Sequence, residues 1–132
     1  MKRNLARAVI AGTAGAAWLF GMTSSAYAAG PGGVEACPSN TVCLYYNSPA
    51  YGWGSFEHWT SGGYSLSDYT FRDYGNGRGY NVTVANNAAG FVNNTGVEWG
   101  VYTQGGAVQY LDPYSSGALN GNIANQDAYL HD

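Results

Sequence analysis

Charge is scarce in this chain of 132 residues, and positive charge is the scarcest. Only 5 residues are Lys or Arg, against 8 that are Asp or Glu. Three of the five cations lie within residues 1–7, so only Arg72 and Arg78 remain beyond residue 28. Residues 29–132 therefore carry a net charge of −6. Affinity for nucleic acids and for anionic membranes depends on Lys and Arg, so we expect neither partner for this part of the chain.

The sequence also lacks an apolar run long enough to span a bilayer. The uncharged, mostly apolar run at residues 8–22 has 15 residues, where a transmembrane helix needs about 20. It follows three basic residues and precedes Ala26, Tyr27 and Ala28, a small-x-small pattern of the kind that signal peptidase cleaves. We predict a secretion signal at 1–28 and an extracellular protein. An uncleaved N-terminal membrane helix is the alternative, and the absence of an Arg-Arg pair argues against a twin-arginine signal.

Cysteine is nearly absent, because only Cys37 and Cys43 occur. In an exported chain, two cysteines this close indicate a disulfide that closes a small loop. Closing a loop of about seven residues stabilises the fold by roughly 2 kcal/mol. A metal site would need further soft ligands nearby, and a redox pair would have two intervening residues instead of five. We therefore predict a structural disulfide.

Helical periodicity is hard to find, whereas short segments with strand character recur. After a flexible lead-in at 29–36, the strand candidates lie at 41–46, 55–59, 80–84, 90–93, 97–102 and 107–111. The turns between them are rich in Gly and Asn, which supply the positive φ angles of tight hairpins. Short strands at this spacing predict an all-β sandwich or barrel, with one domain at 37–132.

A weak internal repeat divides that domain into two halves. Each half opens on an aromatic-rich strand, at 42–45 and at 99–102, and each closes on an Asn-rich turn that leads to a short apolar strand. The turns, at 86–91 and 125–130, are 39 positions apart. Two such halves would pack together as two Greek keys. Chance similarity in a chain rich in Gly, Asn and Tyr is the alternative.

The run CPSNTVCLYYNSPAYGWGSF at 37–56, together with the Asn-Asn-Ala-Ala segment at 86–89, resembles an actinobacterial family of secreted peptidase inhibitors. The type member of that family is the Streptomyces metalloproteinase inhibitor. The resemblance extends from Cys37 to Leu130 and implies a βγ-crystallin-like fold of two Greek-key motifs forming a small sandwich. It also implies inhibition of an extracellular peptidase of the metalloproteinase type. The type member has a second disulfide near its inhibitory loop, which this chain lacks, so no inhibitory residue is carried over.

Three loops are candidates for an inhibitory surface, at 47–54, 75–79 and 103–106. A rigid domain can present such a loop to a peptidase cleft at little ordering cost. The candidate contact residues are Tyr51, Trp53 and Arg78, and the sequence does not choose among the loops. We expect a monomer.

Calcium needs separate treatment, because the resemblance to microbial βγ-crystallins implies a turn of two Asn or Asp residues, two further residues and a hydroxyl pair. Asn86 and Asn87 match its first half, but Gly and Phe replace the hydroxyl residues. The second copy contains Asn125 and Asp127 and lacks the hydroxyl pair too. We interpret both segments as structural Asx turns and expect no cofactor. Weak calcium binding, with Asp127 as the charged ligand, is the alternative.

Residues for catalysis are few. The only histidines, His58 and His131, are 73 positions apart, and no motif of a zinc peptidase or serine hydrolase occurs. Glu57 and His58 are adjacent, but neighbours on a strand point to opposite faces. A carboxylate pair of the glycosidase type is not singled out by anything in the sequence. We predict no enzymatic activity, with His58 on a strand surface and His131 in the C-terminal tail.

An alternative function is that of a surface-associated or carbohydrate-binding module, since aromatic rings on a flat β-face can stack on sugars. The aromatic residues dense enough for this are Tyr45, Tyr46, Tyr51, Trp53, Trp59, Tyr64 and Tyr69. Such rings also serve as core and corner residues of Greek keys, which would leave no glycan surface. A cell-wall or secreted glycan is thus the alternative partner, and a structural or stress-related role is a further option.

Overall fold

The computed structural model describes residues 36–132, so the predicted signal at 1–28 and most of the lead-in lie outside the described residues. In this part of the chain eight strands form, joined by turns and by two short 3-10 segments, η1 (Pro49–Tyr51) and η2 (Leu66–Asp68). The strands are β2 (Val42–Tyr45), β3 (Phe56–Trp59), β4 (Gly63–Ser65), β5 (Gly90–Asn93), β6 (Trp99–Thr103), β7 (Val108–Leu111), β8 (Ser115–Ala118) and β9 (Asp127–His131). No helix in residues 36–132 is long and apolar enough to cross a membrane.

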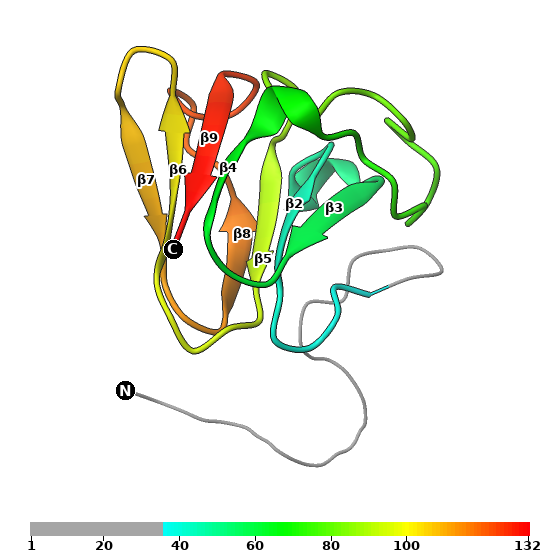
Figure 1. The fold of residues 1–132 in the computed structure, drawn as a ribbon. Helices are drawn as coiled ribbons and strands as arrows, with labels where there is room; N and C mark the ends of the chain where they lie inside the picture. The colour runs from blue at the N-terminus through cyan, green and yellow to red at the C-terminus, as the bar shows by residue number, and fades with distance from the viewer. Residues whose placement is uncertain (1–35) are drawn as a thin grey trace. The chain divides into compact units, whose positions relative to one another are not determined.

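The strands form two four-stranded antiparallel sheets, in the orders β3-β2-β5-β8 and β4-β9-β6-β7 (Figure 1). The predicted all-β sandwich is therefore confirmed. Several of these strands are rich in β-branched and aromatic residues, such as Val42-Cys43-Leu44-Tyr45 in β2 and Trp99-Gly100-Val101-Tyr102-Thr103 in β6, which favour a pleated, half-buried surface.

The strand order repeats between the two halves. In the first half, β2, β3 and β5 lie together in the order β5-β2-β3, while the third strand, β4, joins the other sheet. In the second half, β6, β7 and β9 lie in the order β9-β6-β7, while β8 joins the first sheet. Each set of three follows the 4-1-2 part of the Greek-key order. Each sheet therefore depends on one strand from the opposite half, and the two halves are interlocked.

The two Asn turns meet where the halves join. The Asn86 N–H donates to the carbonyl of Asp127, and the Asn125 N–H donates to the carbonyl of Ala88, each at 2.8 Å. The exchange is reciprocal, because the two donors, Asn86 and Asn125, are 39 positions apart, and so are the two acceptors, Ala88 and Asp127. Asn86 and Asn125 adopt left-handed conformations with φ of 66° and 61°, which Asn tolerates better than most residues.

The core lies between the sheets and draws on both of them. In β2, Val42 and Leu44 belong to the core cluster, whereas Cys43 lies on the other face, as strand alternation requires. The cluster consists of Val42, Leu44, Trp59, Leu66, Phe71, Val84, Ala88, Phe91, Trp99, Val101, Leu111, Leu119, Ile123 and Leu130.

One predicted strand is wrong. Residues 80–84 form turns, with a single isolated bridge between Thr70 and Thr83. Asn81 has a φ of 66°, and the Val82 N–H donates to the carbonyl of Gly79 at 3.0 Å, so the chain bends where the alternating pattern suggested extension. Val84 still enters the core. Pairing here is limited to a short ladder with residues 69–71, in which the N–H groups of Phe71 and Val84 donate to the carbonyls of Val82 and Tyr69, each at 2.9 Å.

Candidate functional site

Two of the three candidate loops, 47–54 and 75–79, pack against each other, and we call them the loop pair. The Asn76 side-chain amide donates to the carbonyl of Gly52 at 2.9 Å. The Ser55 N–H donates to the carbonyl of Arg78 at 2.8 Å. Gly75 approaches so closely that an added Cβ would lie 2.3 Å from the Gly54 carbonyl oxygen. These two loops thus form one composite surface.

Internal hydrogen bonds hold the 47–54 loop in one shape. The N–H groups of Tyr51 and Trp53 both donate to the carbonyl of Ser48, at 3.0 and 3.2 Å, and the Asn47 N–H donates to the carbonyl of Trp53 at 2.7 Å. Trp53 itself has a φ of 69°, which is rare for a bulky residue. Its ring meets that of Tyr45 at 5.0 Å in an edge arrangement. Trp53 is therefore a half-buried anchor, and the loop is preorganised.

Other side chains of the loop pair reach solvent. Tyr51 is 79% exposed at the tip of the 47–54 loop, and Arg78 is exposed on the neighbouring loop. Tyr74 and Tyr80 flank the second loop, with ring centroids 5.3 Å apart, and about half of each residue is exposed. Of the three predicted contact residues, Tyr51 and Arg78 are thus available to a partner, while Trp53 supports the loop from beneath.

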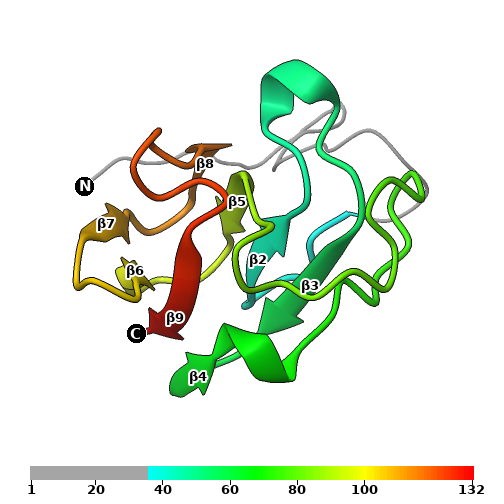
Figure 2. The same cartoon turned by 90° about the horizontal axis from the view of Figure 1, so that it is seen from above.

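The third candidate loop, 103–106, belongs to a hairpin of the other sheet. It joins β6 to β7, with the Gly106 N–H donating to the carbonyl of Thr103 at 3.1 Å. Figure 2 shows this hairpin and the 75–79 loop on opposite sides of the described unit. A single contact surface does not include both.

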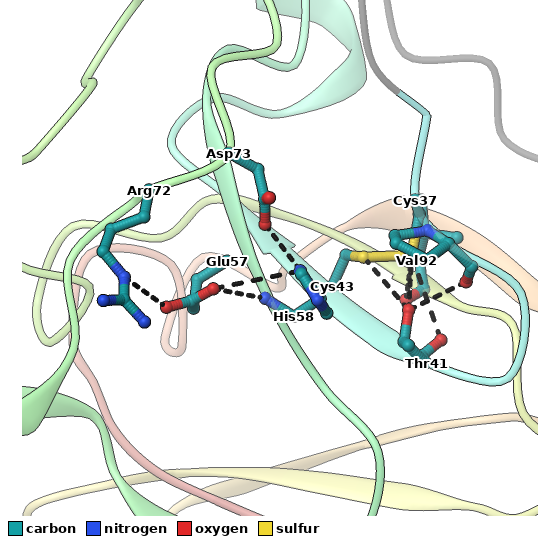
Figure 3. Close-up of polar contacts among 9 residues, drawn as sticks. Cys37, Thr41, Cys43, Glu57, His58, Arg72, Asp73 and Val92 are labelled. Atoms are coloured by element: carbon teal, nitrogen blue, oxygen red, sulfur yellow. Dashed lines mark hydrogen bonds and ion pairs between the residues drawn. A yellow bond between two sulfur atoms is a disulfide. The ribbon is translucent and has the colours of Figure 1, made fainter.

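Beside the loop pair lies a polar cluster that the sequence did not single out, formed by Glu57, His58, Arg72 and Asp73 (Figure 3). His58 Nδ1 lies 2.6 Å from Asp73 Oδ2 and 3.9 Å from Glu57 Oε1. The backbone N–H of His58 donates to Glu57 Oε1 at 3.0 Å, and Arg72 Nε donates to Glu57 Oε2 at 3.3 Å. One imidazole and two carboxylates therefore converge on a small volume.

The expectation that Glu57 and His58 point apart is wrong for the ends of their side chains, and the reason is the position of β3. Glu57 pairs with Leu44, and His58 pairs with Cys43, so the two residues do start on opposite faces. However, β3 is an edge strand, and Asp73 pairs with Phe56 along its open edge through N–H···O bonds of 2.8 and 3.0 Å. The two side chains therefore reach this edge from either side. Only the fold could reveal the contact, since Asp73 is 15 positions from His58.

The predicted disulfide between Cys37 and Cys43 is confirmed, with a Cα–Cα distance of 6.0 Å. Cys43 lies directly across from His58 in the β2–β3 register. Residues opposite each other in a sheet share a face, so the disulfide and the imidazole lie on the same side of this sheet. The cross-link fixes the chain segment that precedes β2 next to the polar cluster.

The calcium candidates behave as parts of structural turns. The Asn87 side-chain amide donates to the carbonyls of Thr83 and Ala85, at 2.9 and 3.2 Å, and so ties up its own loop. Asp127 is fully buried and its Oδ1 accepts the Ala88 N–H at 3.1 Å, whereas Oδ2 has no hydrogen-bond partner. Burial raises the pKa of Asp127 to about 7. These contacts favour the structural interpretation, and calcium binding stays an untested alternative.

The aromatic residues named for glycan binding are mostly packed against one another. Tyr45 and Trp59 are buried, and Trp59 meets Tyr69 and Tyr64 at ring centroid distances of 5.6 and 6.0 Å. Tyr46 packs against Phe71 at 5.8 Å. Only Tyr51 among the seven is widely exposed. Their role is chiefly in packing.

Tyr64, together with rings that were not among the seven, also borders an open groove of about 460 Å³ on the second sheet. Its lining consists of Gly63, Tyr64, Ser65, Tyr102, Tyr129, Leu130 and His131. An added Cβ at Gly100 would lie 2.8 Å from the Tyr102 ring, and one at Gly63 would lie 2.7 Å from the His131 ring. Both rings therefore rest against glycine backbone. Sequence reasoning missed this groove because its residues come from three strands that are distant in the chain.

The comparisons with known proteins give no relative from which a role could be transferred. No family model, no curated protein and no solved structure matches this chain.

Proposed function

We propose that the chain is a secreted, non-enzymatic inhibitor of an extracellular peptidase of the metalloproteinase type, and that the loop pair is its contact surface. The observation that carries the proposal is the exposure of Tyr51 on a loop held by internal hydrogen bonds and anchored by Trp53. A preorganised loop loses little entropy when it binds. Tyr and Arg are also the residues most often found at the energetic centres of interfaces.

Two further features agree with this role. The Cys37–Cys43 disulfide suits an oxidising, extracellular compartment, as does the signal sequence predicted at 1–28. The repeated strand order is in keeping with the βγ-crystallin-like pair of Greek keys that the resemblance to secreted inhibitors implies. Both loops of the pair lie in the first half of the domain, and the 47–54 loop falls within residues 37–56, where that resemblance is strongest.

The test is a titration of secreted peptidases, thermolysin-like and subtilisin-like enzymes included, with the protein purified from an exporting host. We expect stoichiometric loss of a metalloproteinase activity. Tyr51→Ala should raise the inhibition constant by about 10- to 30-fold, the effect of losing about 1.4–2 kcal/mol at an interface hot spot. Tyr110→Ala is the matched control, because Tyr110 is 56% exposed on β7 of the other sheet. It should inhibit as the unaltered protein does.

Full activity of every peptidase, with the inhibitor still folded and uncleaved, would contradict the proposal. Equal weakening by Tyr51→Ala and Tyr110→Ala would keep inhibition but remove the loop pair as its surface. Thermal melts of each variant separate lost contact from lost folding.

The groove on the second sheet favours one second candidate function, the binding of a neutral glycan. Rings that rest on glycine backbone offer flat faces for stacking, and the Tyr hydroxyls and the imidazole supply hydrogen bonds. A pull-down on chitin, cellulose and peptidoglycan tests this function, with Tyr129→Ala as the variant and Tyr51→Ala as the control. Retention of nothing would exclude it.

A further inference from the structure

We propose that His58, Asp73 and Glu57 form a binding site for a divalent transition-metal ion, and that Zn²⁺ fits their donor atoms best. Each residue offers one ligand atom, and the three atoms lie within 4.8 Å of one another (Figure 3). Among the described residues, no other group of three His, Cys, Asp or Glu side chains converges in this way. The site is separate from the exposed tip of the loop pair and does not depend on the inhibitor proposal.

The distances between the donor atoms suit one small ion. Bonds of about 2.0–2.2 Å in a tetrahedral site place two ligand atoms about 3.3–3.6 Å apart. His58 Nδ1 lies 3.9 Å from Glu57 Oε1 and 2.6 Å from Asp73 Oδ2. The first separation is slightly wide, the second is that of a hydrogen bond, and the third, between the two carboxylates, is at most 4.8 Å. An ion would therefore displace the proton that His58 and Asp73 share, and side-chain rotations would move Asp73 Oδ2 outward. Three protein ligands leave the fourth position for water.

The donor types select the class of metal. Imidazole nitrogen suits Zn²⁺, Cu²⁺, Ni²⁺ and Fe²⁺, whereas Ca²⁺ and Mg²⁺ prefer oxygen atoms alone, and in larger number for Ca²⁺. Two carboxylates also balance the two charges of the ion. Because one of its ligands is the His58 imidazole, this cluster does not suit Ca²⁺, the ion considered above for the Asn turns.

The surrounding contacts hold the ligands in place. The Glu57 side chain is only 6% exposed, and Arg72 Nε holds its Oε2 at 3.3 Å while Oε1 faces His58. An outer partner that orients a carboxylate ligand is a general feature of metal sites. The Arg72 side chain is 70% exposed, so solvent screens its charge and it does not take the place of a cation.

The backbone around the ligands is also fixed. Asp73 pairs with Phe56 through two backbone hydrogen bonds, and His58 lies across from the disulfide-bonded Cys43. An ion here would cross-link β3 to the segment that continues into Tyr74 and the 75–79 loop. Because ligands that bind only the native state stabilise it by mass action, we expect the metal to raise the melting temperature.

The experiment uses the full chain, expressed in an exporting host, carrying no histidine tag and freed of metal by a chelator. Calorimetric titration with ZnCl₂ should give one-to-one binding, and CaCl₂ at the same concentration should give none. Excess Zn²⁺ should raise the melting temperature. Co²⁺ in place of Zn²⁺ should produce the visible absorption bands of a tetrahedral site.

Two variants and one matched control locate the ion. His58→Ala and Asp73→Asn each remove one ligand. Loss of a residue that only orients a ligand weakens metal binding by about 10- to 100-fold, so each of these variants should weaken Zn²⁺ binding by at least that much. His131→Ala removes the other histidine of the chain and should bind Zn²⁺ with unchanged affinity. Asp73→Asn preserves side-chain shape, so it decides the matter if His58→Ala does not fold.

Absence of stoichiometric Zn²⁺ binding to the unaltered protein would overturn the proposal, leaving His58 and Asp73 as a hydrogen-bonded pair that fixes the loop. So would undiminished binding by the folded Asp73→Asn variant. Neither result concerns peptidase inhibition, which is measured separately, so the two proposals can fail independently.

Discussion

At the scale of single residues, Asp127 has the most unusual environment. Its carboxyl group is fully buried at the junction of the two Asn turns, with one oxygen bound to the Ala88 N–H and the other without a partner. In the first half, Ala88 occupies the equivalent position, 39 residues earlier, and has no such group. The polar side chain therefore occurs on one side of an otherwise reciprocal pair of turns.

Asp127 should make the fold less stable as the pH rises from about 4 to about 7. Burial raises its pKa from 3.8 to about 7 in the folded protein. In this range the unfolded chain has released the proton and the folded protein keeps it, so the free energy of unfolding falls with rising pH and levels off above about 7. Asp127→Asn removes this titration while retaining an acceptor for Ala88.

Urea unfolding of both proteins from pH 4 to pH 8 checks this prediction. The stability of Asp127→Asn relative to the unaltered protein should increase across the range and then become constant. A difference that does not depend on pH would mean that the Asp127 carboxyl ionises normally in the fold. The comparison cancels the contributions of the other acidic groups, which the two proteins share.

At the scale of elements, the sequence predicted most strands but not all of them. Segments 41–46, 90–93 and 107–111 coincide closely with β2, β5 and β7, and each contributes at least one apolar residue to the core. The strands β4 and β8 contain Gly63-Tyr64-Ser65 and Ser115-Ser116-Gly117-Ala118, with no apolar alternation to mark them. They are edge strands recruited by the opposite half, and a local pattern does not carry that information.

For the candidate site too, the sequence predicted some parts, the exposed loops, and did not predict others, the contacts between distant segments. Gly and Asn clusters marked the exposed loops correctly, and Tyr51 and Arg78 lie on them. The docking of one loop on the other depends on Gly75 and Gly54, whose backbones touch across 21 positions of sequence. The cluster of Glu57, His58 and Asp73 likewise depends on a bridge along an edge strand. Such contacts follow from the tertiary fold and not from the spacing of residues.

The docking of the loop pair should be sensitive to Gly75. This residue has a φ of 57°, and an added Cβ would lie 2.3 Å from the Gly54 carbonyl oxygen. Gly75→Ala should therefore destabilise the fold by more than about 1 kcal/mol, since both backbone strain and a clash with backbone oppose it. Gly121→Ala is the matched control, because nothing lies within 4 Å of its added Cβ.

Urea denaturation of the two glycine variants provides the measurement. Gly121→Ala should unfold at nearly the same urea concentration as the unaltered protein. Equal midpoints for all three proteins would show that the 75–79 loop yields without cost, and the rigidity assigned to the loop pair would then be lost. Gly75→Ala should also inhibit a target peptidase less strongly than the unaltered protein does.

At the scale of the whole molecule, the exchange of β4 and β8 has a consequence for folding. Each sheet takes three strands from one half and one from the other, and the Asn turns add reciprocal hydrogen bonds between the halves. Neither half can bury its apolar face without the other, because residues of both halves form a single core cluster. The resulting contacts are mostly distant in sequence, which is typical of slowly folding β-proteins.

The described part of the chain should therefore unfold in one step, although its strand order is that of two repeated halves. Far-ultraviolet circular dichroism reports on all the strands, whereas fluorescence reports on Trp53 and Trp59 in the first half and on the fully buried Trp99 in the second. Both signals should give the same midpoint and the same slope in urea, as a two-state transition requires. A second transition, or separate midpoints for the two signals, would mean that one half outlasts the other. In that event the interlocking of the sheets would contribute less to stability than the packing within each half.

A chain divided within residues 94–98, between β5 and β6, extends the test. Each fragment alone should remain unfolded, because it would hold an incomplete sheet, an unpaired third strand and half of the core.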